Sequence, residues 1–513
     1  MTTCKHFGSC GGCTYLDIPY HDELSQKEAL LRETLGPHGH LLEGIIPAPS
    51  PLGYRNKMEF AFGDECKDGQ LALGIRKRRS YYEVATLEDC ILIPDDFKQI
   101  ALCVQAYFHE TGDAFFHRKR HTGSLRHLVL RRGEFTGEVL VNLSTTSRLT
   151  ADLTPLISRL LELKLDGQIV GILHSVNNGV ADTVKDDDIR ILHGRDYFRE
   201  RICGLDFTVS AFSFFQTNSA GAEKLYGVVR DMATGVTDAT GASAKGTSHA
   251  AACQSESGTQ TPSFKGSDAH VTPDTLAYDL YCGTGTIAQI LSPGFNKVIG
   301  IELNADAIKA AKENARLNNI TNCEFYAGDV TDVLNSCDVM KGPNTICGQA
   351  TNTVEQPTNA NCQTSITNAQ NLNLSPNEIP DETFDASPTE LPKILDETFN
   401  GGPTELPKIP DEAFNANLAE MPKIPDKTFD TNPAKMPDVV IVDPPRNGLH
   451  PKALAKLIQL APPRLVYVAC KPESLTRDMA ALTEAGYQTL RIMGVDMFPR
   501  TPHVEAVALL EKR

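Results

Sequence analysis

The chain has 513 residues, of which 41% are hydrophobic and 22% charged, which is usual for a soluble globular protein of about three domains. Its net charge of −16 argues against a nucleic-acid partner, because proteins that bind polyanions usually carry a basic surface. No stretch reaches the ~20 apolar residues of a membrane helix, and the N-terminus lacks the apolar core of a signal peptide. We therefore expect a cytoplasmic protein with no membrane partner.

The first chemical motif in the chain is a cysteine cluster. Cys4, Cys10 and Cys13 lie in the Gly-rich segment CKHFGSCGGC, and Cys90 is the best candidate for a fourth ligand. Three cysteines this close in a reducing compartment indicate a metal rather than disulfides. Thiolate ligands suit zinc or an iron–sulfur cluster, and the spacing alone does not choose between them. The C-x3-C-x2-C spacing of radical enzymes is absent, so radical chemistry is not favoured.

The N-terminal half is expected to be rich in β-structure. A helix is predicted over residues 22–36, ended by Gly36, and strands over 125–131 and 138–144. Basic residues gather at 74–82 (GIRKRRSYY) and 117–133 (HRKRHTGSLRHLVLRRG), among tyrosines and histidines. Such tracts can neutralise phosphates while rings stack on unpaired bases, although a solvated face of a strand pair explains the same composition.

Two stretches do not have the pattern of a folded core. Residues 235–274 are rich in Gly, Ser, Thr and Ala, and residues 336–437 in Asn, Thr and Pro. The second stretch repeats every fifteen residues, with phenylalanines at Phe384, Phe399, Phe414 and Phe429. One phenylalanine and one or two aliphatic residues per repeat cannot offset the entropy of ordering, so we expect two mostly disordered insertions. The insertions carry 11 of the 16 net negative charges, which removes most of the argument against a nucleic-acid partner.

From residue 276 onward, short apolar runs alternate with helical periods. The runs include LAYDLY, KVIGIE, VVIV and RLVYVA, each four to six residues long. This alternation predicts an α/β fold with a doubly wound parallel sheet, in which ligands bind at the carboxyl ends of the strands.

Three motifs at predicted strand ends indicate a nucleoside-containing cofactor. DLYCGTGT (279–286) leads from a strand into a helix, and its glycines let the backbone approach a ligand. Glu302 ends the next strand, where it suits a ribose diol, and Asp329 follows a third strand, where it suits an adenine amino group. These three signals do not exclude a nicotinamide cofactor.

DPPR (443–446) is the decisive addition, because an acidic residue and two prolines at a strand end form a rigid turn that faces the crevice. Methyltransferases that act on planar bases use such a turn to hold the base near the methyl donor. Cys470 ends the next strand beside Lys471, a cation that can favour its thiolate. Glu505, in HVE near the C-terminus, is a candidate acid–base partner.

Taken in order, these motifs resemble the RNA uracil-5-methyltransferase family, in particular its iron–sulfur-containing branch that acts on 23S ribosomal RNA. The resemblance rests on CKHFGSCGGC, YRNKMEFAFG (54–63), SFFQTN (213–218), DLYCGTGT, DPPRNG (443–448), YVACKP (467–472) and HVEAV (503–507). It implies a class I SAM-dependent methyltransferase domain over 206–513 and a smaller β-rich iron–sulfur and RNA-binding domain over 1–205. Many family members also have an N-terminal TRAM domain, and this chain begins at the cluster motif.

The resemblance also implies a role for each site residue. A [4Fe–4S] cluster would be held by Cys4, Cys10, Cys13 and Cys90. S-adenosylmethionine (SAM) would be held by Gln216, Tyr281, Thr286, Glu302, Asp329 and Asp443.

Cys470 matches the family nucleophile and Glu505 its base. Addition of the Cys470 thiolate to C6 of uracil activates C5 toward the methyl group, and Glu505 then removes the C5 proton. The target base must first leave its stack, which fits a loop of RNA. The cluster is expected to be structural, because the reaction transfers no electrons. YVACKP has Ala469 and Lys471 where the family commonly has Ser and Asn.

The function expected is methylation of C5 of a uridine in 23S rRNA by a monomeric enzyme. Three alternatives stay open at this point. The first is a tRNA uracil-C5 methyltransferase. The second is a methyltransferase acting on an exocyclic amino group, which needs no cysteine and has an aromatic residue where this chain has Arg446. The third is an iron–sulfur RNA-binding protein without activity, against which the presence of Cys470 and Glu505 argues.

Overall fold

The computed structural model describes residues 4–80, 82–179, 188–235, 275–336 and 436–513. The insertions expected at 235–274 and 336–437 lie almost entirely outside these residues. None of the helices in the described part of the chain is both long enough and apolar enough to span a bilayer.

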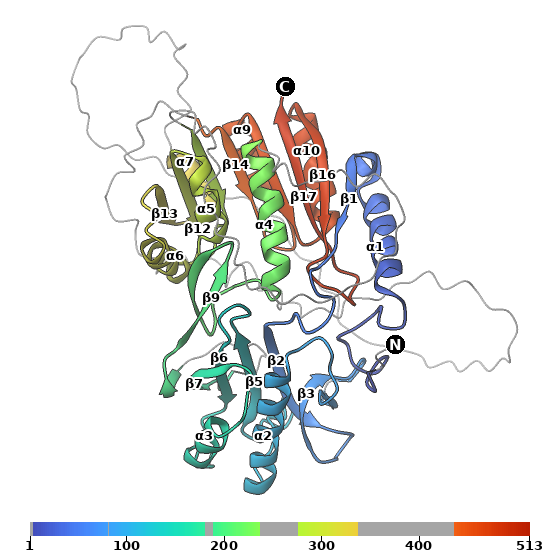
Figure 1. The fold of residues 1–513 in the computed structure, drawn as a ribbon, viewed down its shortest axis with the longest axis vertical. Helices are drawn as coiled ribbons and strands as arrows, with labels where there is room; N and C mark the ends of the chain where they lie inside the picture. The colour runs from blue at the N-terminus through green and yellow to red at the C-terminus, as the bar shows by residue number, and fades with distance from the viewer. Residues whose placement is uncertain (1–3, 81, 180–187, 236–274, 337–435) are drawn as a thin grey trace, which may run out of the picture. The chain divides into compact units, whose positions relative to one another are not determined.

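The larger sheet has eight strands in the order β1-β16-β17-β15-β14-β11-β12-β13 (Figure 1). All neighbouring strands are parallel except that β17 runs antiparallel to both β15 and β16. The strands are β1 (Leu42–Ile46), β11 (Leu276–Leu280), β12 (Lys297–Glu302), β13 (Cys323–Ala327), β14 (Val439–Val442), β15 (Arg464–Ala469), β16 (Tyr487–Val495) and β17 (Glu505–Lys512). The connection from β16 to β17 contains no helix, and a short connection of this kind joins antiparallel strands.

Helices cover both faces of this sheet, which confirms the predicted doubly wound α/β arrangement. One core contains residues of α4 (Ser219–Thr234), α5 (Thr286–Leu291) and α6 (Ala305–Leu317). The other contains residues of α1 (Tyr20–Thr34), α7 (Val330–Ser336), α9 (Pro451–Leu460) and α10 (Pro472–Glu484). Successive strand residues point to opposite faces: Val439 and Ile441 of β14 enter the first core, and Val440 and Val442 enter the second.

The N-terminal helix and strand belong to this larger sheet. Helix α1 begins at Tyr20 and ends at Thr34, close to the predicted 22–36, and a 3-10 turn (Gly36–Leu41) leads into β1. Strand β1 then pairs in parallel with β16, nearly 450 residues later in the chain. Residues 42–46 therefore do not follow the expected division, in which residues 1–205 form a domain of their own.

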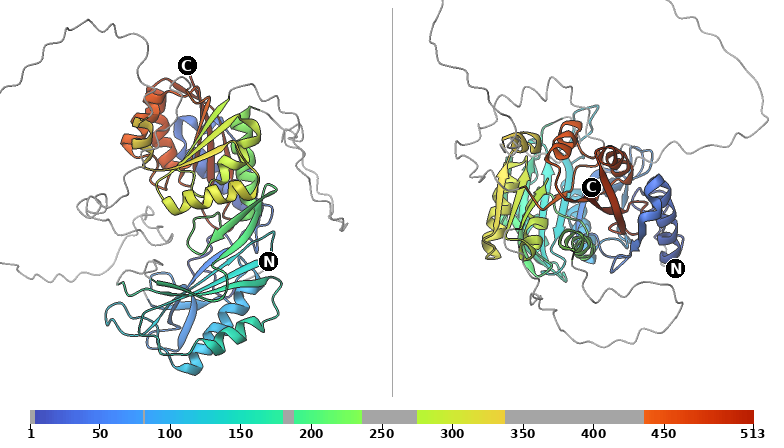
Figure 2. Two further views of the ribbon diagram at one scale, coloured as in Figure 1. Left: turned by 90° about the vertical axis from the view of Figure 1, so that its left-hand side faces the viewer. Right: turned by 90° about the horizontal axis from the view of Figure 1, so that it is seen from above.

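The smaller sheet has seven strands in the order β4-β3-β2-β5-β6-β7-β8. Helices α2 (Asp95–Thr111) and α3 (Thr154–Leu161) pack against one of its faces and share a core with it (Figure 2). The strands are β2 (Lys57–Asp64), β3 (Leu71–Arg76), β4 (Val84–Thr86), β5 (Leu125–Arg132), β6 (Glu138–Thr145), β7 (Gln168–Val176) and β8 (Asp188–Gly194). The strands predicted over 125–131 and 138–144 are thereby confirmed as β5 and β6. A separate antiparallel pair, β9 (Tyr197–Ile202) and β10 (Leu205–Ser210), precedes α4.

Candidate functional site

Most of the predicted site residues lie at one edge of the larger sheet. Tyr281, Asp443 and Cys470 directly follow β11, β14 and β15, Glu302 ends β12, and Asp329 comes two residues after β13. These strands are parallel, so their carboxyl ends meet at the same edge. The sheet therefore brings residues from five strand ends to one crevice edge.

The loop after β11 has an unusual backbone. Tyr281, Gly283 and Gly285 all have positive φ angles, of 66°, 52° and 76°. A Cβ atom at Gly285 would lie 2.6 Å from the Phe325 ring, whereas a Cβ at Gly283 would have no atom within 4 Å. Gly285 is thus required for packing, and Gly283 leaves open space beside the backbone. Open space beside a glycine at the start of a helix is what the close approach of a nucleoside ligand requires.

Two acidic residues fix this loop. Glu302 accepts a hydrogen bond from the backbone N–H of Gly283, with 3.2 Å between nitrogen and Oε2. Asp279, buried in β11, accepts one from the N–H of Ala288 at 2.9 Å, and its other oxygen has no partner among the described residues. Burial, with the charge of Asp443 second, raises the pKa of Asp279 well above its usual value. The sequence analysis did not single out Asp279, although an acid inside the apolar run LAYDLY was a signal.

The residues expected to hold the nucleoside lie in contrasting surroundings. Asp329 is exposed and accepts a hydrogen bond from the Thr331 N–H at 2.7 Å. Burial raises the pKa of Tyr281 to about 12, with the charges of Asp329 and Glu302 as further causes. Thr286 is buried in the first turn of α5, where its hydroxyl oxygen lies 3.5 Å from that of Thr284.

Gln216 lies in the loop that precedes α4. Its side chain is buried, and its backbone carbonyl accepts a hydrogen bond from Asn56 Nδ2 at 3.1 Å. Arg131 of β5 braces the start of this loop, because its Nη1 donates to three carbonyls, those of Ser210 (2.8 Å), Ala211 (3.1 Å) and Ser213 (2.6 Å). The smaller sheet therefore positions this loop beside α4.

This role of Arg131 changes the interpretation of the basic tracts. Arg131 and Arg126 were both counted as residues that could neutralise phosphates, yet both are buried. Arg126 Nη1 donates to the carbonyls of Asn177 and Gly179, at 3.1 and 2.6 Å. Within the two tracts, the exposed cations include Arg79, Lys119 and Arg120, so only a part of the basic sequence presents charge to a partner.

Cys470 and Glu505 meet at the end of an antiparallel strand pair. Ala469 of β15 lies opposite Ala506 of β17, so the adjoining residues, Cys470 and Glu505, follow at the same end. Burial raises the pKa of the half-buried Cys470 thiol to about 12, and the next causes are the negative charges of Glu505 and Asp443. The two candidate catalytic residues are therefore brought together with the acid of the DPPR turn.

Glu505 is buried, and its carboxyl group holds its proton unusually tightly. Burial raises its pKa to about 8, with the charge of Asp443 second, while Arg446 acts in the opposite direction. Burial alone raises the pKa of Asp443 to about 7. Raised values at neighbouring carboxyl groups are typical of catalytic sites, because a base works best when its pKa lies near the working pH.

Arg446 is the cation that acts most strongly on the Cys470 thiol, and it lowers the pKa of that thiol. The sequence pointed instead to Lys471, the next residue in the chain. Lys471 is exposed and immediately precedes α10 as its N-cap residue. Adjacency in sequence was therefore a poor guide to the charge that the thiol experiences.

The turn that carries Asp443 and Arg446 is held by α10. Asp478 Oδ2 accepts hydrogen bonds from the Leu449 N–H at 2.8 Å and the Tyr467 hydroxyl at 2.6 Å. Arg477 donates to the carbonyl of Asn447 at 2.8 Å. A Cβ atom at Gly448, whose φ is 77°, would lie 2.6 Å from the Asp478 carboxylate. Gly448 is therefore required for this turn to lie against α10.

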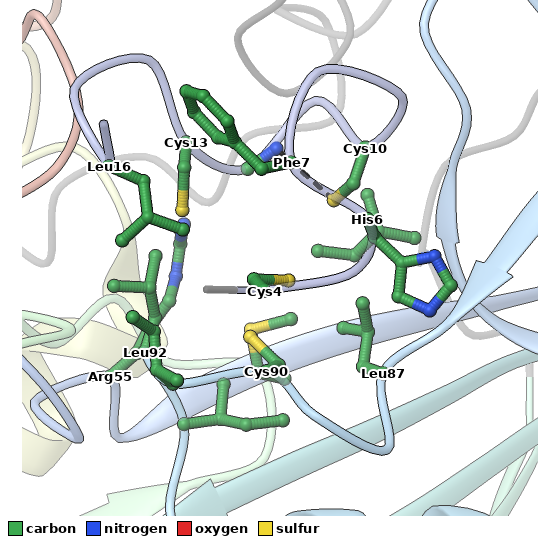
Figure 3. Close-up of a pocket in the computed structure, with 15 residues that line it drawn as sticks. Cys4, His6, Phe7, Cys10, Cys13, Leu16, Arg55, Leu87, Cys90 and Leu92 are labelled. Atoms are coloured by element: carbon green, nitrogen blue, oxygen red, sulfur yellow. Dashed lines mark hydrogen bonds between the residues drawn. The ribbon is translucent and has the colours of Figure 1, made fainter. Parts of the chain in front are cut away.

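The cysteines of the N-terminal motif line a hollow of about 470 Å³, its open mouth included. Cys4, Cys10, Cys13 and Cys90 all border it, and Figure 3 shows their sulfur atoms turned toward a common space. Burial raises the pKa of Cys13 to about 12, and the charges of the other three thiols add to this rise. The structure thus gathers the four predicted ligands, although among the described residues no group of three or more has the ready-made geometry of a metal site.

The surroundings of these thiols suit a metal or cluster. The Gly12 N–H donates to Cys10 Sγ at 3.3 Å, and backbone N–H groups of Leu92 and Ile93 lower the pKa of Cys90 against the larger effect of burial. Arg55 lowers the pKa of both Cys10 and Cys13. Amide donors and a cation aimed at sulfur stabilise thiolates, which are the form that binds metal.

The sequence matches two known families of domains. Residues 273–392 match the family described as methyltransferase domain, and residues 433–513 match the family described as tRNA (uracil-5-)-methyltransferase. An uncharacterized RNA methyltransferase of Clostridium tetani is 34% identical, over 99% of this chain and 84% of its own length. Another, from Clostridium acetobutylicum, is 33% identical over the same shares.

The fold is similar to a solved structure. The crystal structure of Pyrococcus abyssi tRNA (uracil-54, C5)-methyltransferase in complex with S-adenosyl-L-homocysteine matches 97% of this chain and 85% of that one, with a TM-score of 0.59 and 24% identity. The fold is therefore that of class I SAM-dependent methyltransferases, and the domain match supports SAM as the cofactor. The chain belongs to the RNA uracil-5-methyltransferase family, as the motifs from CKHFGSCGGC to HVEAV indicated.

Proposed function

We propose that this protein transfers a methyl group from SAM to C5 of a uridine in 23S rRNA, through a covalent bond between Cys470 and C6 of the base. The observation that carries the proposal is the placement of Cys470 beside Glu505, at the strand pair next to the Asp443 turn. A methyltransferase that acts on an exocyclic amino group needs neither a nucleophilic thiol, such as that of Cys470, nor a second catalytic base, such as Glu505. The pair therefore favours C5 methylation over the amino-group and inactive alternatives.

The cofactor would lie along the five strand ends of the larger sheet. The residues proposed to hold it are Gln216, Tyr281, Thr286, Glu302, Asp329 and Asp443. The open space at Gly283 and the carboxylates at the ends of β12 and β13 suit a nucleoside with a ribose and an adenine. SAM, when bound, supplies a methyl group on a positively charged sulfur, and that sulfur leaves as a neutral thioether.

The catalytic cycle begins with Cys470. Its raised pKa makes it a thiol at neutral pH, so its proton must pass to solvent before the sulfur attacks. The thiolate forms a bond to C6, and the C5–C6 electron pair moves onto the uracil carbonyl as an enolate. The enolate then returns its electrons through C5, which forms a bond to the methyl carbon.

Glu505 completes the cycle. Its carboxylate removes the proton from C5, the C–H electron pair restores the C5–C6 double bond, and the C6–S bond breaks to release the Cys470 thiolate. Arg446, which acts on both the Cys470 thiol and the Glu505 carboxyl, favours the charged form of each. A single cation thus supports the nucleophile and the base.

We further propose that Cys4, Cys10, Cys13 and Cys90 hold a [4Fe–4S] cluster. The four thiols, the amide donors and the nearby arginines match the needs of an all-thiolate site. The reaction transfers no electrons, so the cluster would hold the N-terminal segment in place. From the family resemblance we also propose a division into two domains at about residue 205, to which β1 is an exception. We propose on the same basis that the enzyme is a monomer.

Transfer RNA is the second candidate substrate, after 23S rRNA. Transfer RNA is favoured by the description of the domain family that residues 433–513 match, which names tRNA. The four-cysteine hollow favours ribosomal RNA, since it corresponds to the cluster motif on which the resemblance to the ribosomal branch rests. Mass-spectrometric mapping of 5-methyluridine in 23S rRNA and tRNA from a deletion strain distinguishes them. Loss of the modification from 23S rRNA alone supports the proposal, and loss from tRNA alone contradicts its substrate.

A further inference from the structure

The loop between β16 and β17, residues 496–504, leads directly to Glu505 and is called the base loop below. Its carbonyl groups from Met497 to Arg500 each accept a hydrogen bond from a different part of the chain. The donors are Asn218 Nδ2 to Met497 (3.0 Å), Lys27 Nζ to Phe498 (3.2 Å), the Tyr54 hydroxyl to Pro499 (2.9 Å), and the N–H groups of Thr14 and Tyr15 to Arg500 (2.7 and 3.2 Å). Four consecutive carbonyls held from outside leave this loop little freedom to move.

Lys27 is a buried charge at the centre of these contacts. Its ammonium group lies 2.8 Å from Glu23 Oε1 and 2.8 Å from Asp496 Oδ1, and all three side chains are fully buried. Asp496 also accepts a hydrogen bond from the Tyr20 hydroxyl at 2.8 Å. Desolvating a lysine and two carboxylates is costly, and such groups are weak evidence for stability, whereas they can fix one arrangement of the segments they join.

Arg500 shows that the loop is held in a strained form. It is a non-glycine residue with a φ of 69°. Its N–H donates to Glu23 Oε1 at 2.6 Å, and its guanidinium donates to the carbonyl of Ile18 at 3.0 Å. A left-handed conformation at such a residue persists only where its surroundings enforce it, and it is commonest at functional sites.

We propose that the base loop is a positioning element for Glu505, and that Lys27 and Tyr54 are the positioning residues that hold it. The inference rests on the proposed function, since it assigns to these residues the placement of the base in that reaction. A general base must lie within hydrogen-bond reach of its proton, and a displacement of about 1 Å can slow a step on the order of a hundredfold.

The proposal predicts which step fails when the loop is loosened. Cys470 directly follows β15 and lies outside the base loop, so we expect the S–C6 bond and the new C5–CH3 bond still to form. Removal of the C5 proton by Glu505 slows, so the C6–S bond cannot break and the methylated adduct accumulates on ordinary uridine RNA. A merely destabilised enzyme would lose all steps together and would accumulate no adduct.

Tyr54→Phe is the principal test, because it removes one hydroxyl and leaves the ring in place. The chain provides a matched control: the buried Tyr487 hydroxyl also donates to a proline carbonyl, that of Pro462, at 3.0 Å. Pro462 and Tyr487 lie at the end of β15 and β16 remote from Cys470. Tyr487→Phe therefore loses the same type of bond away from the base loop.

The experiment measures kcat, KM for RNA and SAM, and the fraction of protein covalently bound to unmodified RNA on denaturing gels. We expect Tyr54→Phe to lower kcat about tenfold, the effect of one lost hydrogen bond, with both KM values within about twofold and a clear rise in adduct. Tyr487→Phe should behave as the unmodified enzyme. Lys27→Met should show a larger rise in adduct; Tyr54→Phe keeps the test decisive if that variant does not fold.

The outcomes separate this inference from the proposed function. An unchanged kcat in Tyr54→Phe, a loss without adduct, or equal losses in Tyr54→Phe and Tyr487→Phe overturns the positioning role. If the unmodified enzyme neither makes 5-methyluridine nor forms an adduct with 5-fluorouridine RNA, the proposed function itself is overturned, and the role assigned to the loop with it.

Discussion

Two regions of this molecule contain cysteines with raised pKa values, yet their neighbours differ. In the N-terminal hollow, Cys13 is raised by burial and by three other thiols, and the groups that oppose the rise are cations and backbone amides. At the sheet edge, the pKa of Cys470 is raised by burial and by two carboxylates, with no thiol of the described residues among the main causes. Thiols that share one space suit a metal, whereas a single thiol beside carboxylic acids suits nucleophilic attack followed by proton transfer. The neighbours, more than the cysteine itself, indicate the chemistry.

The largest expected effect is the loss of methylation when Cys470, the cysteine at the sheet edge, is replaced and the cysteines of the N-terminal hollow are kept. Cys470→Ala should reduce methylation of RNA by roughly a thousandfold or more, because among the described residues no other cysteine follows or belongs to β15 or β17 to replace the nucleophile. The iron content should stay unchanged. Cys66→Ser, which alters an exposed cysteine, is the control and should retain full activity. Measurable turnover by Cys470→Ala near that of the control would contradict the assignment.

The reverse experiment removes one of the proposed cluster ligands in the N-terminal hollow. Cys13→Ser should lower the bound iron and sulfide of purified protein to a small fraction and should lower the melting temperature by roughly 10 °C, because metal binding contributes folding free energy. Iron analysis and thermal unfolding check both. If the variant keeps its full iron content, Cys13 is not a ligand. The contrast drawn between metal-binding thiols in the hollow and a nucleophilic thiol at the sheet edge would then be wrong.

The third prediction uses the pKa of Glu505. With a pKa of about 8, the carboxyl group is mostly protonated at pH 7 and mostly ionised at pH 9. The base form therefore increases about tenfold over this range, and kcat should rise by at least a similar factor. The Cys470 thiol, with its pKa of about 12, acts in the same direction. A kcat that falls from pH 7 to pH 9 while the protein stays folded would contradict Glu505 as the base.

The smallest effect concerns stability. The pKa of Glu505 rises from 4.5 to about 8 on folding, so between these values the folded state binds a proton that the unfolded state has lost. Stability contributed by this group therefore falls as the pH rises from 4.5 to 8. Glu505→Gln removes that loss and should stabilise the protein by on the order of 2 kcal/mol at pH 8.5 and by less at pH 5.5. Urea unfolding at both pH values checks this, and a destabilised variant at pH 8.5 would contradict it.

Parts of the site could be predicted from sequence because parallel strands order their ends. Once VVIV, RLVYVA and KVIGIE are identified as strands, Glu302, Asp443 and Cys470 must meet at one edge. The antiparallel register of β15 and β17 then places Glu505 opposite Cys470. Local pattern and sheet geometry were sufficient for Glu302, Asp443 and Cys470, whereas Glu505 was singled out by the family resemblance and the antiparallel register came from the structure.

Other features depend on contacts that no local pattern contains. The pairing of β1 with β16 and the ion pair of Lys27 with Asp496 join segments more than 400 residues apart. Arg131 belongs to a basic tract, but its alternation within β5 turns it toward the buried carbonyls of another loop. A charge in a sequence does not reveal whether it faces solvent or backbone, since tertiary packing decides this.

The central claim is that Cys470 forms the covalent bond to the RNA base, and one measurement tests it most directly. RNA containing 5-fluorouridine carries fluorine where Glu505 would remove a proton, so the adduct cannot release. Incubation with SAM, digestion and peptide mass spectrometry should find the methylated nucleotide attached to the peptide that contains Cys470. Attachment to another residue, or an equal yield of adduct from Cys470→Ala, would contradict the account.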